Sequence, residues 1–347
     1  MHAAVYRKEI QGLRIEEVPE PEVGPGEVKV RVHYASVCGS DLFLLTSGRI
    51  PDGTVLGHEM SGVVEDLGEG VEGLSLGQSV IVRPVGCGFC PACQRGEENL
   101  CPKRLAIGLG AMPGAFAERL VVPQDMAIKV PAGLDLSLAC LAEPLATALH
   151  GIRLGGIVGE DKVLILGAGG VGLCAVAMLR ALGVKEILVS EPEKGRRQRA
   201  SALGASYVVD PESQSLEEAV ARCSKGRGVT AVLECSGDVE ALQSAMGVVA
   251  SGGKVVLIGL VKGSVEWAPA VAMLRQIRIQ GSFANTQAEC RECLDMLANG
   301  RLDVREMIEG VIGLEGLPAR VGELLHSPGK GKVLIRVMGV RGRAGGE

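Results

Sequence analysis

The chain has 347 residues, which at ~150 residues per domain favours two domains over one or four. Its apolar fraction is 47%, yet it has only 1 Trp, 3 Tyr and 4 Phe, so the core must be built from aliphatic side chains. Lys and Arg number 36 against 41 Asp and Glu, and a chain this acidic and this poor in aromatic residues lacks the basic surface that nucleic acids require. We therefore expect no nucleic-acid partner.

The N-terminal residues argue against export. Residues 1–10 include Arg7, Lys8 and Glu9 where a signal peptide needs an unbroken apolar segment, so we expect a cytoplasmic protein. The apolar stretch 163–179 is shorter than the ~20 residues that span a bilayer and is interrupted by glycines, so we expect no membrane partner. Eleven cysteines in such a chain indicate metal ligands or reduced thiols rather than disulfides.

The first part of the chain, to about residue 130, consists of short apolar runs separated by turns rich in Gly and Pro. This pattern predicts an irregular β-rich domain. The expected strands are 3–6, 28–34, 62–66, 79–82 and 117–122.

From about residue 161, apolar runs alternate with amphipathic segments of helix length. Fully apolar strands separated by helices predict an α/β fold with a doubly wound parallel sheet. The expected strands are 162–166, 186–191, 207–210, 230–235 and 254–260, and the expected helices are 171–182, 194–203, 216–224 and 239–249. Beyond them we expect helices 286–298 and 314–325, a strand 332–337 that returns to the first domain, and a disordered tail 340–347.

A glycine-rich turn follows the first of these later strands. The run from Gly167 to Gly172 matches G-x-G-x-x-G between a strand and a helix. Glycine is needed at Gly167 for the tight turn, at Gly169 for close approach of a pyrophosphate, and at Gly172 for packing of the helix on the strand. Together with Gly170, Val171 and the free N–H groups of the following helix, this turn predicts a dinucleotide site.

The residues after the next strand bear on the choice of dinucleotide. Glu191 lies about 20 residues beyond the glycines, where an acid grips the ribose 2′-hydroxyl of NAD. Arg196 lies just beyond, between Lys194 and Arg197. An arginine at this place can accept the 2′-phosphate of NADP. The alternative is that these basic residues form a solvated helix face. We predict NAD, with NADP as the alternative.

Four cysteines lie within one short segment in the spacing C-x2-C-x2-C-x7-C. Four thiolates close tetrahedrally on Zn²⁺ and leave no position for substrate, so the pattern predicts a structural zinc site formed by Cys87, Cys90, Cys93 and Cys101. The competing interpretations are an iron–sulfur cluster, whose usual spacing differs, and a nucleic-acid-binding zinc ribbon, which the acidic balance opposes. A second C-x-x-C, at Cys290 and Cys293, has no paired ligands nearby and is interpreted as packing.

A second set of residues with metal-binding side chains is more dispersed. Cys38, His58 and Glu59 supply a thiolate, an imidazole and a carboxylate, and Glu143 is a further acid. Three protein ligands with an open fourth position make a catalytic zinc site. By spacing alone, ordinary core residues remain the alternative.

Together these motifs resemble those of the zinc-containing medium-chain dehydrogenases, the family of alcohol, polyol, threonine and butanediol dehydrogenases. The resemblance covers nearly the whole chain and rests on Cys-Gly-Ser-Asp at 38–41, Gly-His-Glu at 57–59, the four-cysteine segment, Glu-Pro-Leu at 143–145 and the turn at 167–172. It implies a GroES-like β-rich catalytic domain at 1–151 and 288–347 and a Rossmann domain at 152–287, with the active site in the cleft between them. It also implies a homodimer or homotetramer with one catalytic and one structural zinc ion per chain.

The resemblance assigns roles to the dispersed set. Cys38 and His58 are similar to catalytic zinc ligands, and Glu143 stands where alcohol dehydrogenases have a second cysteine ligand. Direct binding of zinc by Glu143 and holding of a zinc-bound water are both left open. It is also left open whether Glu59 replaces that water as a zinc ligand.

Two neighbours of Cys38 complete the implied site. Ser40 resembles the hydroxyl that accepts the proton of the substrate alcohol, and Asp41 resembles an acid that orients a zinc ligand; for each, a turn-capping residue is the alternative. The implied activity is zinc-dependent hydride transfer between a secondary alcohol or polyol and NAD(H). The alternatives are a threonine- or sugar-phosphate-type dehydrogenase of the same family and a non-catalytic zinc- and nucleotide-binding sensor.

Overall fold

The computed structural model describes residues 1–110, 112–327 and 329–337. They form two compact units: the first unit comprises Met1–Glu143, Gly310–Pro328 and Lys332–Glu347, and the second unit comprises Pro144–Glu309 and Gly329–Gly331. These limits differ from the domain boundaries at 151/152 and 287/288, which stay predictions. The tail expected at 340–347 lies outside the described residues.

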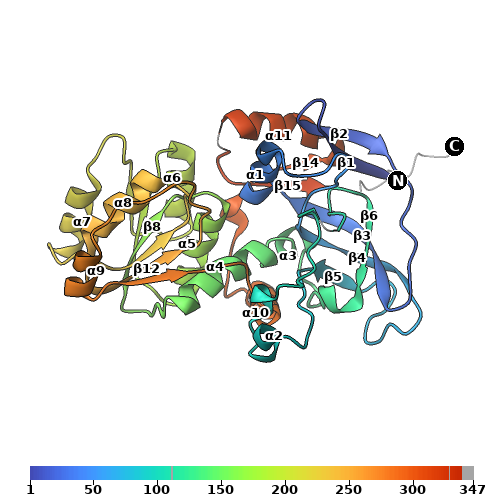
Figure 1. Cartoon of the computed structure of the whole chain (residues 1–347), viewed down its shortest axis with the longest axis horizontal. Coiled ribbons are helices and arrows are strands. Elements are labelled where there is room, and N and C mark those ends of the chain that lie inside the picture. Colours follow the sequence, from blue (N-terminus) through green and yellow to red (C-terminus); the bar gives the residue numbers. More distant parts are fainter. Residues whose placement is uncertain (111, 328, 338–347) are drawn as a thin grey trace. The chain divides into compact units, whose positions relative to one another are not determined.

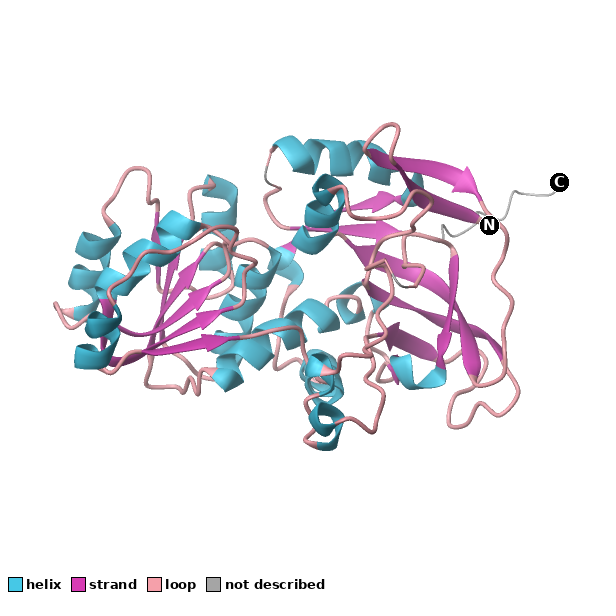
Figure 2. Ribbon diagram, viewed as in Figure 1, coloured by secondary structure: helices cyan, strands magenta, loops and turns pink. Residues whose placement is uncertain are grey.

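The first unit is built on antiparallel strands. Its larger sheet has the order β14-β15-β3-β4-β5-β7, with β6 also paired to β3, and the hairpin β1–β2 forms a separate sheet. Figure 2 draws the strands as magenta arrows. The bounds are β1 His2–Arg7, β2 Gly12–Glu17, β3 Glu27–Ser36, β4 Glu59–Leu67, β5 Ser79–Val82, β6 Arg119–Pro123, β7 Ala127–Lys129, β14 Ile308–Gly313 and β15 Lys332–Arg336. The helices are α1 Gly39–Ser47, α2 Pro91–Gln94, α3 Leu136–Ala139 and α11 Leu317–His326.

Strand β3 shows why these residues form a half-buried sheet. Val28, Val30 and Val32 are buried while the residues between them are partly exposed, the period-two pattern of a strand with one face on a core. Strand β15 pairs with β3, with Leu334 opposite Ser36, so the expected return of the last strand is confirmed.

The second unit contains a parallel sheet with the order β10-β9-β8-β11-β12-β13. Its strands β8 and β12 are labelled in Figure 1. Counted from β8, this is the Rossmann order 3-2-1-4-5-6. The strands are β8 Lys162–Leu166, β9 Glu186–Ser190, β10 Tyr207–Val209, β11 Val229–Glu234, β12 Val249–Leu257 and β13 Arg278–Gly281. Strand β8 is buried from Val163 to Leu166, as a strand covered on both faces requires, and the predicted fold class is confirmed.

The helices around this sheet are α4 Ala142–Leu154, α5 Gly170–Ala181, α6 Lys194–Ala202, α7 Leu216–Ser224, α8 Val239–Val248, α9 Pro269–Arg275 and α10 Gln287–Ala298. Sequence reasoning missed α1 and α4, because α1 opens with the poor helix formers Gly39 and Ser40, and α4 carries Pro144 in its first turn. The strand expected at 254–260 runs instead from Val249 to Leu257. Among the described residues, no helix is long and apolar enough to cross a bilayer.

Candidate active site

The start of helix α1 positions two of the predicted site residues. Cys38 immediately precedes the helix, and Asp41 lies in its first turn. Asp41 Oδ2 accepts a hydrogen bond of 2.8 Å from the Cys38 N–H, so the carboxylate satisfies a free helix-end donor and fixes the backbone that carries the thiol. Its other oxygen, Oδ1, lies 3.3 Å from His58 Nδ1. The buried Asp41 therefore connects both residues.

A tight turn at Gly57 delivers His58 and Glu59 to the interior. Gly57 has a φ of +95°, and a β carbon there would lie 2.6 Å from the ring of Phe116, so only glycine suits the position. The Phe116 N–H donates to the Leu56 carbonyl at 3.0 Å and holds the turn in place. His58 is 7% exposed and Glu59 is fully buried at the start of β4.

Cys38, His58 and Glu59 bring a sulfur, a nitrogen and an oxygen atom within 4.8 Å of one another. Thiolate, imidazole and carboxylate are the three donor types that zinc takes from proteins. Glu59 Oε1 is buried without a hydrogen-bond partner among the described residues, which is costly for a carboxylate unless a cation binds there. The residues present therefore fit a zinc ion with an open position for another ligand.

The surroundings of His58 favour positive charge. Burial lowers the pKa of His58, but the nearby carboxylate of Asp41 and the thiol of Cys38 outweigh it, so the pKa lies well above its ordinary value. The same negative groups that favour a proton on the ring favour a divalent cation beside it. Ser40 Oγ lies 3.3 Å from His58 Nε2, which places the predicted proton acceptor at this cluster.

Glu143 lies in the first turn of α4 and is not among the three grouped donors. Its carboxylate acts on Arg104: burial lowers the pKa of Arg104, and the charge of Glu143 opposes that shift. The structure thus brings together Ser40, Asp41, Cys38, His58 and Glu59 and places Glu143 near an arginine.

Sequence reasoning missed two residues that contact Glu59. Ser36 Oγ and Lys332 Nζ both donate to Glu59 Oε2, and all three side chains are buried. Lys332 lies 273 residues from Glu59 and opens an apolar strand, where a lysine ordinarily marks a solvated strand end. No local sequence signal pairs these residues, because the contact depends on β15 lying beside β3.

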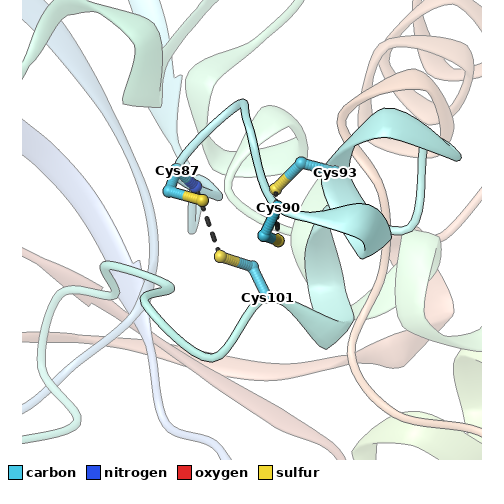
Figure 3. Close-up of side chains that lie close together, drawn as sticks. All are labelled: Cys87, Cys90, Cys93 and Cys101. Atoms are coloured by element: carbon cyan, nitrogen blue, oxygen red, sulfur yellow. Dashed lines mark hydrogen bonds between the residues drawn. The ribbon is translucent and has the colours of Figure 1, made fainter.

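The four-cysteine segment folds into a compact loop around α2 (Figure 3). The four sulfurs lie within 4.8 Å of one another, and Cys90 Sγ and Cys93 Sγ are 3.5 Å apart. A disulfide would need about 2.05 Å, whereas tetrahedral zinc with Zn–S bonds of about 2.3 Å separates two sulfurs by about 3.8 Å. The backbone N–H of Phe89 lowers the pKa of Cys87 to about 6, which favours the thiolate that zinc binds, whereas burial raises the pKa of Cys93 to about 11 in the absence of a cation. The loop therefore fits a structural zinc ion.

The loop also requires a glycine at one position, because the backbone there lies close to a sulfur atom. A β carbon at Gly86 would lie 2.5 Å from Cys93 Sγ, so any side chain there would displace one of the sulfurs.

The glycine-rich turn has the geometry that a dinucleotide site requires. Gly167 has a φ of +82°, and a β carbon at Gly172 would lie 2.0 Å from the Gly167 carbonyl oxygen, so the helix can approach the strand only without a side chain. At Gly169 a β carbon would meet only Arg196 Nη1, at 3.9 Å, which leaves room for a phosphate. Gly169 caps α5 without a side-chain hydrogen bond, so the leading N–H groups, with Gly170 and Val171, are available to an anion.

Glu191 ties this turn to the next strand. The buried carboxylate accepts hydrogen bonds from Ala168 N at 2.7 Å and from Glu193 N at 2.9 Å. Arg196 Nη1 lies 3.8 Å from Glu191 Oε2, and Arg196 Nε donates to the Gly329 carbonyl at 2.6 Å. Both predicted cofactor-binding side chains therefore lie at the carboxyl end of β9, beside the glycine-rich turn.

Further side chains of metal-binding type, one histidine and the second C-x-x-C, have structural partners. His150 Nδ1 lies 3.1 Å from Glu289 Oε1. Cys290 and Cys293 are fully buried in α10, and Cys290 Sγ contacts Asn285 Oδ1 at 3.1 Å, in keeping with packing cysteines.

Two family models match the chain in the order of its two sheets. The alcohol dehydrogenase GroES-like domain matches residues 24–132, and the zinc-binding dehydrogenase model matches residues 170–299.

Curated relatives and solved structures agree with these models. L-threonine 3-dehydrogenase of Pyrococcus abyssi is 37% identical over 272 residues, covering 77% of this chain and 78% of the relative, and sorbitol dehydrogenase of Bacillus subtilis is 32% identical over 324 residues, covering 91% of each. An alcohol dehydrogenase from Thermus sp. ATN1 superposes with a TM-score of 0.90 at 33% identity, covering 97% of this chain and 100% of that one. Acetophenone reductase from Geotrichum candidum in complex with NAD has a TM-score of 0.86 at 28% identity, covering 97% of each chain. The resemblance inferred from the motifs is thereby confirmed: the chain is an oxidoreductase of the zinc-containing medium-chain dehydrogenase family.

Proposed function

We propose that this protein is a zinc-dependent dehydrogenase that transfers a hydride between a secondary alcohol or polyol and NAD(H). The observation that carries the proposal is the convergence of donor atoms from Cys38, His58 and Glu59 within 4.8 Å, beside the Ser40 hydroxyl. Three protein donors leave one position of a tetrahedral ion open, which distinguishes this site from the four-cysteine loop. Zinc bound there supplies a Lewis acid that polarises the substrate oxygen and lowers the pKa of the substrate hydroxyl.

The chain's own residues handle the proton and the geometry. Ser40 Oγ, 3.3 Å from His58 Nε2, accepts the proton of the substrate hydroxyl. Leu42 and Phe43 follow Asp41 and have no proton-carrying group, so we propose that the proton leaves through water or the ribose hydroxyls. The hydride moves from the carbinol carbon to nicotinamide C4, so the alcohol becomes a carbonyl compound as NAD⁺ becomes NADH.

Glu59, rather than Glu143, is our candidate for the carboxylate ligand, because Glu59 belongs to the donor cluster and has a buried free oxygen. Glu59→Gln is expected to lose catalytic zinc, while Glu143→Gln keeps both zinc ions and loses turnover. Metal analysis per chain decides between them. If Glu143→Gln bound one zinc ion per chain and Glu59→Gln bound two, Glu143 and not Glu59 would be the carboxylate ligand.

For the dinucleotide we propose a preference for NAD. The Glu191 carboxylate accepts two hydrogen bonds of the roughly four it can take and lies 3.8 Å from Arg196 Nη1, which still leaves capacity for a ribose hydroxyl. Glu191→Ser should lower the ratio of kcat/KM for NAD to that for NADP roughly 10-fold or more. Glu186→Gln, at the exposed start of β9, is the matched control. A wild-type preference for NADP would contradict the proposal.

The substrate class rests on the relatives and on the carboxylate in the donor set. The relatives are named for threonine, sorbitol and D-xylulose. Each of these compounds carries polar groups next to a carbon that bears a hydroxyl or carbonyl oxygen. We propose a hydrophilic substrate with a secondary hydroxyl, and threonine and sugar phosphates remain the alternatives within the family.

A substrate panel with and without metal tests the proposal as a whole. Secondary alcohols, polyols, threonine and sugar phosphates are offered with NAD and with NADP, before and after chelation, and NADH absorbance is followed. We expect turnover of at least one polyol that disappears on chelation and returns with zinc. A protein that binds zinc and dinucleotide but turns over none of these compounds would be a sensor instead.

Replacing the sulfur ligand sharpens the same test. Cys38→Ser should abolish turnover and spare dinucleotide binding, whereas Cys223→Ser, on α7 of the second unit, should leave both unchanged. Full activity in Cys38→Ser would remove Cys38 from the mechanism.

We also propose a homodimer or homotetramer in a reducing cytoplasm, where free thiolates are available to zinc. Among the described residues, strand β13 pairs only with β12 and forms one edge of the six-stranded sheet. Helix α9, just before it in the chain, exposes large apolar side chains, including Met273 at 69% and Leu274 at 76%. Such an edge and patch suit a second copy of the chain. Light scattering should report an oligomer that Leu274→Asp weakens, and a monomeric wild-type protein would contradict this.

A further inference from the structure

One side chain beside the donor cluster, Lys332, has no part in the chemistry described above although it forms a buried ion pair with Glu59. Lys332 is 3% exposed and Glu59 is fully buried, and Lys332 Nζ donates directly to Glu59 Oε2. Lysine is rarely buried without a charged partner, because its ammonium group loses water on burial. The carboxylate of Glu59 supplies that partner.

The same ammonium group also contacts the backbone next to the sulfur ligand. Lys332 Nζ donates to the Val37 carbonyl at 3.0 Å, and the Val37 N–H donates to the Val333 carbonyl at 3.3 Å. Val37 precedes Cys38 directly. One side chain from the C-terminal strand therefore touches the residue before one candidate ligand and the carboxylate of another.

The two oxygens of Glu59 are in different situations. Oε2 accepts from both Lys332 Nζ and Ser36 Oγ, whereas Oε1 is buried and has no hydrogen-bond partner among the described residues. A carboxylate binds a metal through one oxygen or through both. With Oε2 engaged by an ammonium group and a hydroxyl, only Oε1 is available.

We propose that Lys332 is a positioning residue that keeps Glu59 a one-oxygen donor and so preserves the open coordination position that substrate needs. The proposal rests on the proposed function, since it takes Cys38, His58 and Glu59 as the metal ligands. Without the ammonium group, the Ser36 hydroxyl is the remaining donor to Oε2 among the described residues, and a neutral donor competes less well with a cation, so both oxygens of Glu59 turn to the metal. The extra bond occupies the substrate position and holds the metal more tightly.

Cobalt(II) substitution tests this without relying on activity. Four-coordinate cobalt(II) absorbs visible light more strongly than five- or six-coordinate cobalt(II), so its absorption reports the number of ligands. Since the four-cysteine loop also binds cobalt, the spectrum of Cys38→Ser is subtracted to isolate the catalytic site. Release of the metal to a chelator is the second measurement.

Lys332→Met is expected to weaken the absorption at least about twofold, because the second oxygen of Glu59 raises the coordination number. It should also slow metal release roughly 10-fold, because one more metal–oxygen bond must break first. Lys332→Arg keeps a cation that donates to Oε2 and should match wild type. Ser36→Ala removes the other Oε2 donor without removing a charge and should change both readouts in the same direction but less. If Lys332→Met does not fold, Ser36→Ala and Lys332→Arg still decide the matter.

The possible failures are distinguishable. A wild-type spectrum no stronger than that of Cys38→Ser would mean that no metal binds at the cluster, and the proposed function would fail with this inference. A strong wild-type spectrum that is unchanged in both Lys332→Met and Ser36→Ala would overturn the role of Lys332 alone.

Discussion

Replacement of Asp41 is the most direct test of how the candidate metal site is organised. The buried carboxylate accepts a 2.8 Å hydrogen bond from the Cys38 N–H and lies 3.3 Å from His58 Nδ1, so one side chain orients two candidate ligands. Loss of such an outer partner weakens metal binding about 10- to 100-fold, or about 1.4–2.7 kcal/mol. Asp41→Asn keeps an oxygen for Cys38 but removes the charge facing His58, so we expect roughly 10-fold weaker zinc binding. Asp41→Ala loses both contacts, and we expect roughly 100-fold.

Competition with a chromophoric chelator measures both affinities, and the four-cysteine loop serves as an internal reference that should keep its zinc. Asp135→Ala is the matched control, because Asp135 caps α3 in the same unit through a 2.7 Å hydrogen bond from the Ser137 N–H. Its loss should lower stability without changing zinc affinity. Wild-type zinc affinity in a well-folded Asp41→Ala protein would refute the argument that Asp41 orients the ligands.

Two further predictions concern the second unit. Gly172→Ala would place a methyl group 2.0 Å from a backbone oxygen, so we expect a lower melting temperature and loss of NAD binding. Gly247→Ala, in open space on α8, should keep NAD binding and should not lower the melting temperature, because alanine is the better helix former. Burial raises the pKa of Glu289, but hydrogen bonds from His150 and the Thr286 N–H lower the pKa by more. The pKa of Glu289 therefore lies below its usual 4.5. A carboxylate whose pKa is lower in the folded state stabilises the fold above pH 4.5. This stabilisation is lost as the pH falls through the pKa of the folded state. The difference in unfolding free energy between wild type and Glu289→Gln should therefore shrink on acidification below pH 4.5, and a difference independent of pH would contradict the assignment.

Motifs whose residues are close in sequence were predictable in detail. The four cysteines at 87–101 need only one short loop to bring their sulfurs together, and the turn at 167–172 needs only the local geometry of a strand, a tight turn and a helix. Apolar periodicity likewise placed β5, β8 and α7 at the residues where the structure has them. In these cases chain connectivity alone limits the arrangement.

The catalytic cluster depends on more than connectivity. Cys38 and Glu59 come together because β3 and β4 pair with Ser36 opposite Glu59, and Lys332 joins them because β15 pairs with β3. Sequence reasoning left open whether Glu59 or Glu143 binds zinc directly, and among the described residues the geometry groups only Glu59 with Cys38 and His58.

The sequence by itself therefore determined the fold class, the family and the residue types that bind metal and dinucleotide, since these follow from local patterns of glycine, cysteine and apolar residues. Only the tertiary structure decided which carboxylate joins the sulfur and the imidazole, and that a lysine 273 residues away occupies its second oxygen. The physical reason is that strand pairing over such separations is set by packing of the whole core, and no short stretch of sequence encodes it.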